Sequence, residues 1–456
     1  MRLTKRMALA GLLALPVLWG GMLVGLFGVN QVYWDEWRMI EELKIFRDSG
    51  VSLAALYSQH NEHRIFLPRI VLMATGTKSG YNTIIHMCLG QLLVLVAYAC
   101  QVRFVLRLSQ NDPRRRWTTG VLLLAGFSCY NTMQYENFLW GFQIGFLMVL
   151  AFASLAFYHM DLAVREGRPG HLVLALLAGI GASLSSLHGL FVWPVFGAQW
   201  SLARLSKAPF PVPYSLSVLA VAVASCAAYF MGYQKPDYHP DYLEGGAGRA
   251  VAYFFATVGS TGAARFAGWA VVTGVLIFAA SLVLCLHLVR TRRVRAYLFP
   301  IGLVLFGYAV AASLAIGRAG LKAGVAGAMT SRYSTYSILI FAGILLIVYG
   351  EYLLRAPASA AGQEWGRKYC LAVVALLACF VLIKNVAYLH PARKWREDRE
   401  AGIAITRNYR SATWEQLQKV GPFANGAHAI ESIGILEEFG WGPFSKSIAV
   451  AEAAEP

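Results

Sequence analysis

Long apolar stretches alternate with short polar segments along most of the chain. Each stretch has roughly the 20 residues that a helix needs to cross a hydrocarbon layer about 30 Å thick. Because backbone groups in lipid must pair within their own segment, each stretch is predicted to be an α-helix. The expected fold is an all-α, polytopic transmembrane helical bundle of about eleven spans. These lie at residues 7–29, 82–104, 118–134, 138–158, 171–187, 189–204, 214–232, 266–288, 298–316, 336–353 and 370–388.

Two of these boundaries need a separate argument. The region 118–158 is one apolar stretch of about twice the length of a span, and the polar residues Gln134–Asn137 divide it. The first stretch, Met7–Val29, follows three basic residues as a secretory signal does. It is longer than a typical signal core and lacks a clear A-x-A cleavage site, so we expect an uncleaved first helix.

Basic residues gather in alternate connecting segments, which predicts the orientation. Lys and Arg flanking apolar spans mark the cytoplasmic side. The basic segments are Arg2/Lys5/Arg6, Arg103–Arg116, Arg165/Arg168, Arg204/Lys207, Arg290–Arg295 and Arg355/Arg367/Lys368. The outside then receives Asn30–Ser79, Gly232–Arg265, Gly317–Thr335 and the tail. This predicts a cytoplasmic N-terminus, a transmembrane domain over 1–389 and a short periplasmic tail over 390–456.

The first outer loop, residues 30–80, is too long for a plain connector. Met39, Ile40, Leu43 and Phe46 share one face of a helix predicted over Glu36–Arg47, with charged residues on the other face. We expect this amphipathic helix to lie at the membrane interface, and the apolar patch Val51–Tyr57 to do the same. The tail has a helical pattern near Trp414–Val420.

Composition supports a membrane protein over a nucleic-acid-binding one. Of the 456 residues, 57% are hydrophobic and only 14% are charged, well below the quarter that soluble domains carry. The net charge of +16 falls in clusters beside the spans, so it is assigned to membrane topology and not to nucleic acid. The seven cysteines all lie in apolar runs, where they are expected to be small core residues.

The distribution of acids bears on function. All 24 Asp and Glu lie outside the predicted span interiors or at their edges. Ion-coupled transporters usually place a carboxylate near the middle of the membrane. The pattern therefore disfavours an ion-driven pump, while passive or lipid transport stays open.

Polar residues of the types that take part in catalysis or ligand binding gather in the first outer loop. Asp35 and Glu36 directly follow the first span, where carboxylates can act as a general base or bind a divalent cation. The run His60–Arg64 follows in the same loop. His60 and His63 on one helical face, with Glu62, suggest a partial metal site, and Arg64 suits phosphate. The alternative for each group is a solvated or helix-capping role.

Four later residues complete the candidates. Glu136 and His188 occupy short turns at the outer surface. Arg318 and Arg332 flank a Gly-rich outer loop, where arginines and backbone amides can hold phosphate. Acids from an early loop and arginines from a late one suit glycosyl transfer from a polyprenyl-phosphate sugar. A base takes the acceptor proton, and cations hold the leaving phosphate.

At this point the chain resembles the GT-C type of membrane glycosyltransferase. The resemblance rests on Asp35–Glu36 after the first span, on the long first outer loop and on the many spans. The stretches Tyr135–Gln143 and Ser331–Tyr333 also resemble bacterial membrane proteins of this layout. It implies an inverting transferase of the bacterial inner membrane, with Asp35 as base and Glu36 as its partner. His60–Arg64 is not a general motif of that family, and the tail is smaller than many of its periplasmic domains.

The expected partners are a polyprenyl-phosphate-linked sugar, a glycan or lipid acceptor, and membrane lipid. No cofactor is required by the sequence, although a divalent cation is compatible with it. Two alternatives remain open. One is a flippase or transporter of lipid-linked saccharides, and the other is a polymerase or ligase of surface polysaccharide with a diphosphate-linked donor.

Overall fold

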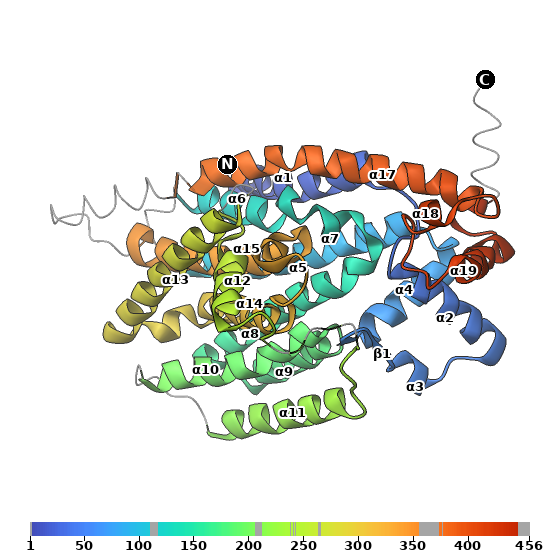
Figure 1. Ribbon diagram of the computed structural model, residues 1–456. Coiled ribbons are helices and arrows are strands. Elements are labelled where there is room, and N and C mark those ends of the chain that lie inside the picture. Colours follow the sequence, from blue (N-terminus) through green and yellow to red (C-terminus); the bar gives the residue numbers. More distant parts are fainter. Residues whose placement is uncertain are drawn as a thin grey trace.

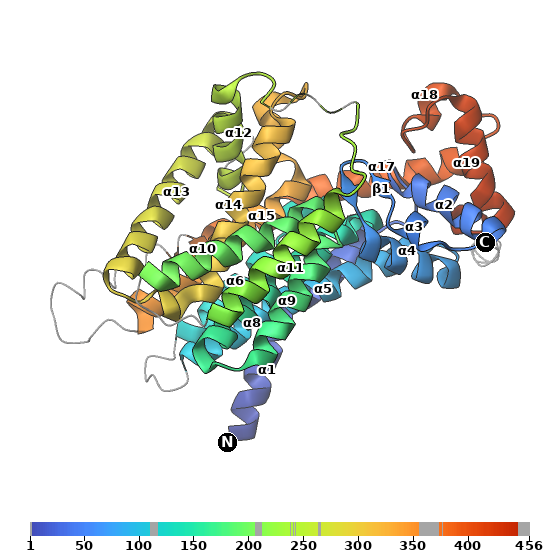
Figure 2. The same cartoon turned by 90° about the horizontal axis from the view of Figure 1, so that it is seen from below.

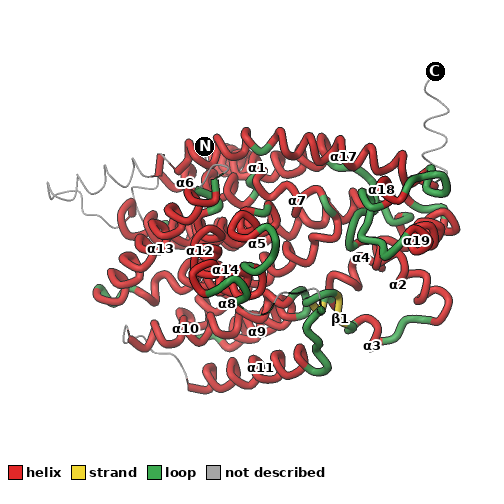
Figure 3. The backbone as a smooth tube through the Cα atoms, viewed as in Figure 1, coloured by secondary structure: helices red, strands yellow, loops and turns green. Residues whose placement is uncertain are grey.

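A computed structural model describes residues 2–109, 117–205, 212–354 and 374–445, apart from 238, 240, 242, 263–265 and 376. Helices make up most of this part of the chain, and the small hairpin β1–β2 is the one sheet in it (Figure 3). The predicted basic residues Arg114–Arg116, Lys207, Arg355, Arg367 and Lys368, and the start of the last predicted span, lie outside the described residues.

Seven described helices are long and apolar enough to cross a membrane. Six of them correspond to α1 (Arg2–Phe27), α5 (Thr83–Leu108), α8 (Ile144–Glu166), α11 (Val212–Phe230), α13 (Ala267–Arg290) and α14 (Leu298–Arg318), and the seventh is the continuous helical stretch Ser331–Leu354, whose central part is α15 (Ser334–Val348). Shorter helices stand at the other predicted spans: α6 (Thr118–Cys129), α9 (Pro169–Ser183), α10 (Val192–Leu205) and a helix over 377–387. The protein is therefore an all-α polytopic membrane protein, as the apolar pattern predicts.

Short helical turns connect these elements. They are η2 (Thr132–Gln134), α7 (Tyr135–Leu139), η3 (Gly141–Gln143), η4 (Leu187–Phe191), η5 (Val294–Tyr297), η6 (Gly324–Met329), η7 (Ser331–Tyr333) and the π-helical turn η8 (Tyr349–Leu354). The division of 118–158 is wider than predicted, because α6 ends at Cys129 and α8 begins at Ile144. Two short turns and α7 fill that interval.

The first loop and the tail meet at one end of the bundle, away from the N-terminus (Figures 1 and 2). The loop contributes α2 (Glu36–Ser49), α3 (Leu53–Leu56), β1 (Gln59–His60), β2 (His63–Arg64) and α4 (Phe66–Ser79). The tail contributes α17 (Leu389–Arg407), α18 (Trp414–Leu417), α19 (Gly426–Phe439) and η9 (Gly442–Phe444). Helix α17 runs beside α1, and α19 packs on α2.

The apolar face of α2 packs against the protein, where we expected it from the sequence to face the membrane interface. Its apolar face is inside the protein, with Met39 and Ile40 fully buried. They belong to one hydrophobic cluster with Ile433 and Leu436 of α19. Burial of that face against the tail supplies the apolar contact that the sequence pattern requires, so α2 needs no lipid partner.

A further helix, α12 (Ala247–Gly259), lies inside the segment predicted as a loop between two spans. It packs along α13 and also contacts α14. The contact is so close that a Cβ atom at Gly274 would lie 1.9 Å from the carbonyl oxygen of Phe255. Only glycine fits there, which explains how a short apolar helix joins the bundle.

Candidate functional site

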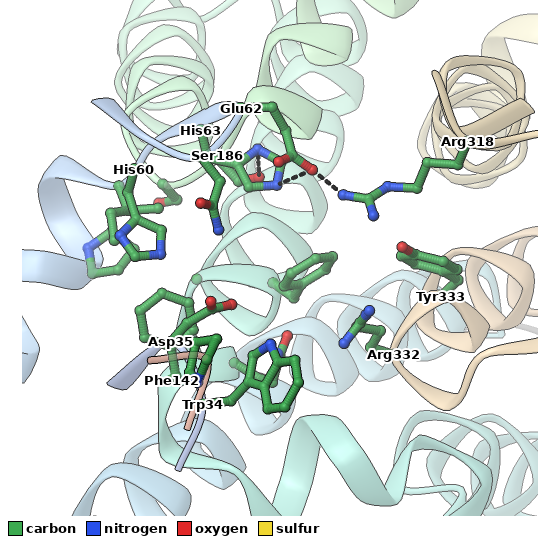
Figure 4. Close-up of a pocket in the computed structure, with 18 residues that line it drawn as sticks. Trp34, Asp35, His60, Glu62, His63, Phe142, Ser186, Arg318, Arg332 and Tyr333 are labelled. Atoms are coloured by element: carbon green, nitrogen blue, oxygen red, sulfur yellow. Dashed lines mark hydrogen bonds and ion pairs between the residues drawn. The ribbon is translucent and has the colours of Figure 1, made fainter. Parts of the chain in front are cut away.

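A cavity of about 580 Å³, here called the main cavity, lies where the first loop meets the ends of the spans. Six of the ten residues expected at the site line it: Asp35, His60, Glu62, His63, Arg318 and Arg332. Figure 4 shows the carboxylates of Asp35 and Glu62 and the guanidinium groups of Arg318 and Arg332 pointing toward a common space. Chain segments almost 300 residues apart thus meet at one site.

Asp35 is held by an unusual turn at the start of α2. The preceding residue, Trp34, has a φ of 51°, in the left-handed region that a bulky side chain rarely adopts. The carbonyl oxygen of Val420 in the tail accepts hydrogen bonds from the Trp34 backbone amide (3.1 Å) and the Trp37 indole (3.0 Å). Such strain persists only where the surroundings enforce it, and here the tail does so.

The electrostatic surroundings of Asp35 suit a base. Burial raises the pKa of its carboxyl group from 3.8 to about 6, although Arg332 pulls it down. The nearby Glu62 carboxylate adds to the increase, while the side chain of Asn61 and then Arg318 lower it. A pKa close to neutral pH leaves Asp35 largely ionised yet able to take a proton.

The run His60–Arg64 forms a hairpin and not the expected helical face. His60 and His63 are directly paired across β1 and β2, and Asn61 in the turn has a φ of 50°. The tip of the hairpin carries Glu62 into the cavity. Within the described part of the chain, no three His, Cys, Asp or Glu side chains cluster in a way that fits a metal ion.

Glu62 is the centre of an ionic network. It forms an ion pair with Arg318, and its carboxylate oxygens lie 3.2 Å from His239 and 3.5 Å from His63. Burial opposes ionisation, but His63, His239 and Arg318 outweigh it and hold the pKa of Glu62 well below its usual range. Glu62 is therefore a fixed negative charge that occupies Arg318.

Arg332 is placed by contacts between two stretches that the sequence singles out. Its backbone carbonyl accepts a hydrogen bond from the Asn137 side chain (3.0 Å), and Ser331 donates one to the Met133 carbonyl (2.7 Å). Met133 of η2 and Asn137 of the Tyr135–Gln143 stretch thus anchor η7. The guanidinium of Arg332 lies 3.8 Å from Glu136, so this ion pair is looser than the Glu62–Arg318 pair.

The other four expected residues do not line the main cavity. Glu136 lies beside the cavity and forms an ion pair with Arg332. Arg64 lies outside, where it donates hydrogen bonds to the carbonyls of Tyr57, Tyr229 and Met231, so its contacts are structural. His188 is buried against His63 and its Nδ1 lies 3.0 Å from the Tyr336 hydroxyl. It lines a smaller neighbouring cavity of about 200 Å³.

Glu36, the fourth, is fully buried behind Asp35. Its Oε2 accepts a hydrogen bond from the Tyr33 amide (3.0 Å), which closes the turn that presents Asp35. Burial raises the pKa of Glu36 from 4.5 to about 8, against the opposing effect of the Tyr33 and Phe142 amides and Arg399. At neutral pH it is therefore a neutral acid that holds the backbone.

This protonation predicts a pH-dependent stability. The folded protein keeps the Glu36 proton up to about pH 8, whereas the unfolded chain loses it near pH 4.5. The contribution of Glu36 to the free energy of unfolding is complete below about pH 4.5 and falls as the pH rises to about 8. The Glu36→Gln variant cannot ionise at this position and does not lose this stability. The melting temperature of the variant in detergent should therefore rise relative to that of the wild type as the pH increases over this range. A constant difference between pH 5 and 8 would show that Glu36 is ionised in the folded protein.

Several residues of the main cavity are not evident from the sequence. Phe142 stands in the stretch Tyr135–Gln143 that the sequence does single out, Trp34 adjoins Asp35, and Tyr333 adjoins Arg332. Ser185, Ser186 and the tail residue Pro422 carry no such signal. Only their contacts in the folded chain bring them to the site.

A scan against protein-family models and a search of curated proteins both find no match to this chain. The evidence for function is therefore the cavity itself. Asp35 provides a carboxylate with a pKa of about 6, Glu62 and Arg318 form a compensated pair, and Arg332 forms a looser ion pair with Glu136. His60 is neutral, since burial first and then Arg69 and His63 lower its pKa to about 3.

Proposed function

We propose that the protein is a membrane glycosyltransferase that moves a sugar from a polyprenyl-phosphate donor to a glycan or lipid acceptor. The observation that carries this proposal is the joint presence of Asp35, Arg318 and Arg332 in one cavity at the end of the bundle. The proposed reaction places the cavity at the periplasmic face of the bacterial inner membrane, with a cytoplasmic N-terminus. That orientation is the one favoured by the basic segments of the sequence.

The proposed chemistry is a single displacement with inversion. The acceptor hydroxyl oxygen attacks the anomeric carbon of the donor sugar as the bond from that carbon to the phosphate oxygen breaks. Asp35 takes the hydroxyl proton, and polyprenyl phosphate leaves with the bonding electrons. Arg332 stabilises the charge that grows on the leaving phosphate.

The charges in the cavity favour a monophosphate donor over a diphosphate. Arg318 is already paired with Glu62, while Glu136 lies 3.8 Å from Arg332. One phosphodiester charge matches the more loosely paired guanidinium of Arg332. A diphosphate would bring a second charge against Glu62 and Asp35, which argues against the polymerase or ligase alternative.

The position of the cavity argues against a flippase. Its lining comes from the first loop, the turns η3 and η7, the start of α8, the end of α14, Ser185–Ser186 and the tail. These elements belong to the end of the bundle away from the N-terminus (Figure 2). An alternating-access transporter instead builds its site near the middle of the membrane.

Isotope-labelled donors test the proposal. Membranes containing the protein are supplied with ¹³C-labelled polyprenyl-monophosphate sugars or diphosphate-linked saccharides, and products are followed by mass spectrometry. We expect label from a monophosphate donor to enter a glycan or lipid, with release of polyprenyl phosphate, only when the protein is present. Consumption of diphosphate donors alone would favour a polymerase. Movement of intact donor between leaflets without cleavage would favour a flippase.

A further inference from the structure

A second cavity of about 310 Å³ adjoins the main cavity. The two share Trp34, Asp35, His60, Asn61 and Pro422. The second cavity extends from this shared wall between α2 and the tail segment after α18. Asp35 therefore stands at the junction of two spaces.

The lining of the second cavity combines aromatic rings with polar side chains. Trp34 is 40% exposed, which is unusual for a tryptophan held in a strained turn. Arg38 provides guanidinium donors on the same wall, while the Gln59 side chain is held by hydrogen bonds to the backbone of Asn61 and Gln234. His60 is 8% exposed, and its Nε2 has no hydrogen-bond partner among the described residues. A buried nitrogen without a partner leaves this wall with an unsatisfied polar group just below its surface.

Charges around the second cavity are compensated within the protein. Arg38 lies 3.8 Å from Glu41 and 3.5 Å from Glu42. Glu41 in turn lies 2.9 Å from His428 of the tail. The cavity thus offers hydrogen bonds and an aromatic face but little net charge. That combination suits a sugar, whose C–H faces stack on rings and whose hydroxyls bond to planar polar groups.

We infer that the second cavity is the acceptor subsite, and that it binds the hydroxyl-bearing end of a neutral carbohydrate. This inference rests on the proposed function. Arg332 and Tyr333 line the main cavity but not the second, whereas Arg38 and Gln59 line the second but not the main. The donor phosphate and the acceptor thus approach Asp35 from different sides, as an inverting displacement requires.

The tail completes this subsite. Pro422, Phe423 and His428 line the second cavity, and the Val420 carbonyl fixes Trp34 and Trp37. The acceptor would therefore bind between the first loop and the tail, which gives the tail a function. A tail too small for a separate carbohydrate-binding domain suffices when it forms one wall of a shared cavity.

Binding of free oligosaccharides tests the inference without requiring catalysis. The full-length protein in detergent is mixed with neutral pentasaccharides of mannose, galactose, glucose or arabinose, and with anionic pentagalacturonate. Saturation-transfer NMR reports contact. We expect at least one neutral pentasaccharide to bind, and Trp34→Ala to weaken it about tenfold. Trp414→Ala, at an exposed tryptophan of the tail, is the matched control and should bind like the wild type.

A second variant guards against misfolding. Arg38 has a largely exposed side chain, so Arg38→Ala should fold and should also weaken binding. The inference would be overturned by any of three results. They are no binding of any neutral pentasaccharide, wild-type binding by both Trp34→Ala and Arg38→Ala, and a preference for the anionic probe. Binding that depends on Trp34 in a protein that transfers no sugar would instead support the subsite and contradict the transferase. Sugar transfer with an acceptor KM unchanged in both variants would instead support the transferase and contradict the subsite.

Discussion

Asp35→Asn should reduce the rate of sugar transfer by about 10²- to 10⁴-fold, the usual contribution of a general base. The same chemical change one residue later, Glu36→Gln, should keep most of the activity. The reason is their surroundings. Asp35 lies in the main cavity with a pKa of about 6, whereas Glu36 is fully buried with a pKa of about 8 and is already neutral at pH 7. Glutamine reproduces a neutral acid, but asparagine cannot take a proton.

The comparison is made by label transfer from the monophosphate donor, with membrane insertion checked by size-exclusion profiles in detergent. The wild-type rate should also fall below about pH 6, as Asp35 becomes protonated. Glu36→Ala, which loses the bond to the Tyr33 amide, serves as a control and should impair activity by loosening the turn. If Asp35→Asn transfers sugar at the wild-type rate, or if Glu36→Gln is the inactive one, the base has been assigned wrongly.

Arg69→Met should destabilise the folded protein by about 3 to 5 kcal/mol, as removal of one partner of a buried ion pair does. Arg69 is fully buried at the start of α4, and its Nε donates to Glu42 of α2 over 2.8 Å. It also donates to the carbonyls of Leu56 (2.6 Å) and Ser58 (2.9 Å). The variant leaves Glu42 without this countercharge. It also removes the hydrogen-bond donor of the Leu56 and Ser58 carbonyls, which directly precede the hairpin that carries Glu62.

Thermal and denaturant unfolding in detergent measure this effect. The double variant Glu42→Leu/Arg69→Met should recover part of the loss, since it leaves no buried carboxylate uncompensated. Arg410→Met breaks an exposed ion pair with Glu437 and should change stability by at most about 1 kcal/mol. Equal effects of the Arg69 and Arg410 variants would mean that the buried pair does not hold the first loop together.

The secondary structure could be predicted where one physical constraint dominates. Apolar stretches of span length must be helical in lipid, and α5, α13 and α14 follow the predicted ranges closely. The amphipathic pattern of α2 also predicts its helix. It does not reveal what the apolar face packs against, because lipid and α19 both satisfy the same requirement.

The site was less accessible to sequence reasoning. Polar residues at the ends of spans attract notice because few polar groups are tolerated nearby, and six of the ten candidates do line the main cavity. The local conformation of His60–Arg64 was not accessible, since spacing alone cannot distinguish a hairpin from a helical turn. Nor does spacing distinguish Arg64, which binds backbone carbonyls, from Arg332, which faces the cavity.

The sequence by itself determined that this is a helical membrane protein with its polar candidate residues near the helix ends, since hydrophobicity and span length are local properties of the chain. Only the tertiary structure decided which carboxylate faces the cavity, which arginine is already paired, and that the tail forms part of the wall. Those outcomes depend on contacts between segments hundreds of residues apart. Burial and neighbouring charge, which set the pKa values of Asp35 and Glu36, exist only once those contacts form.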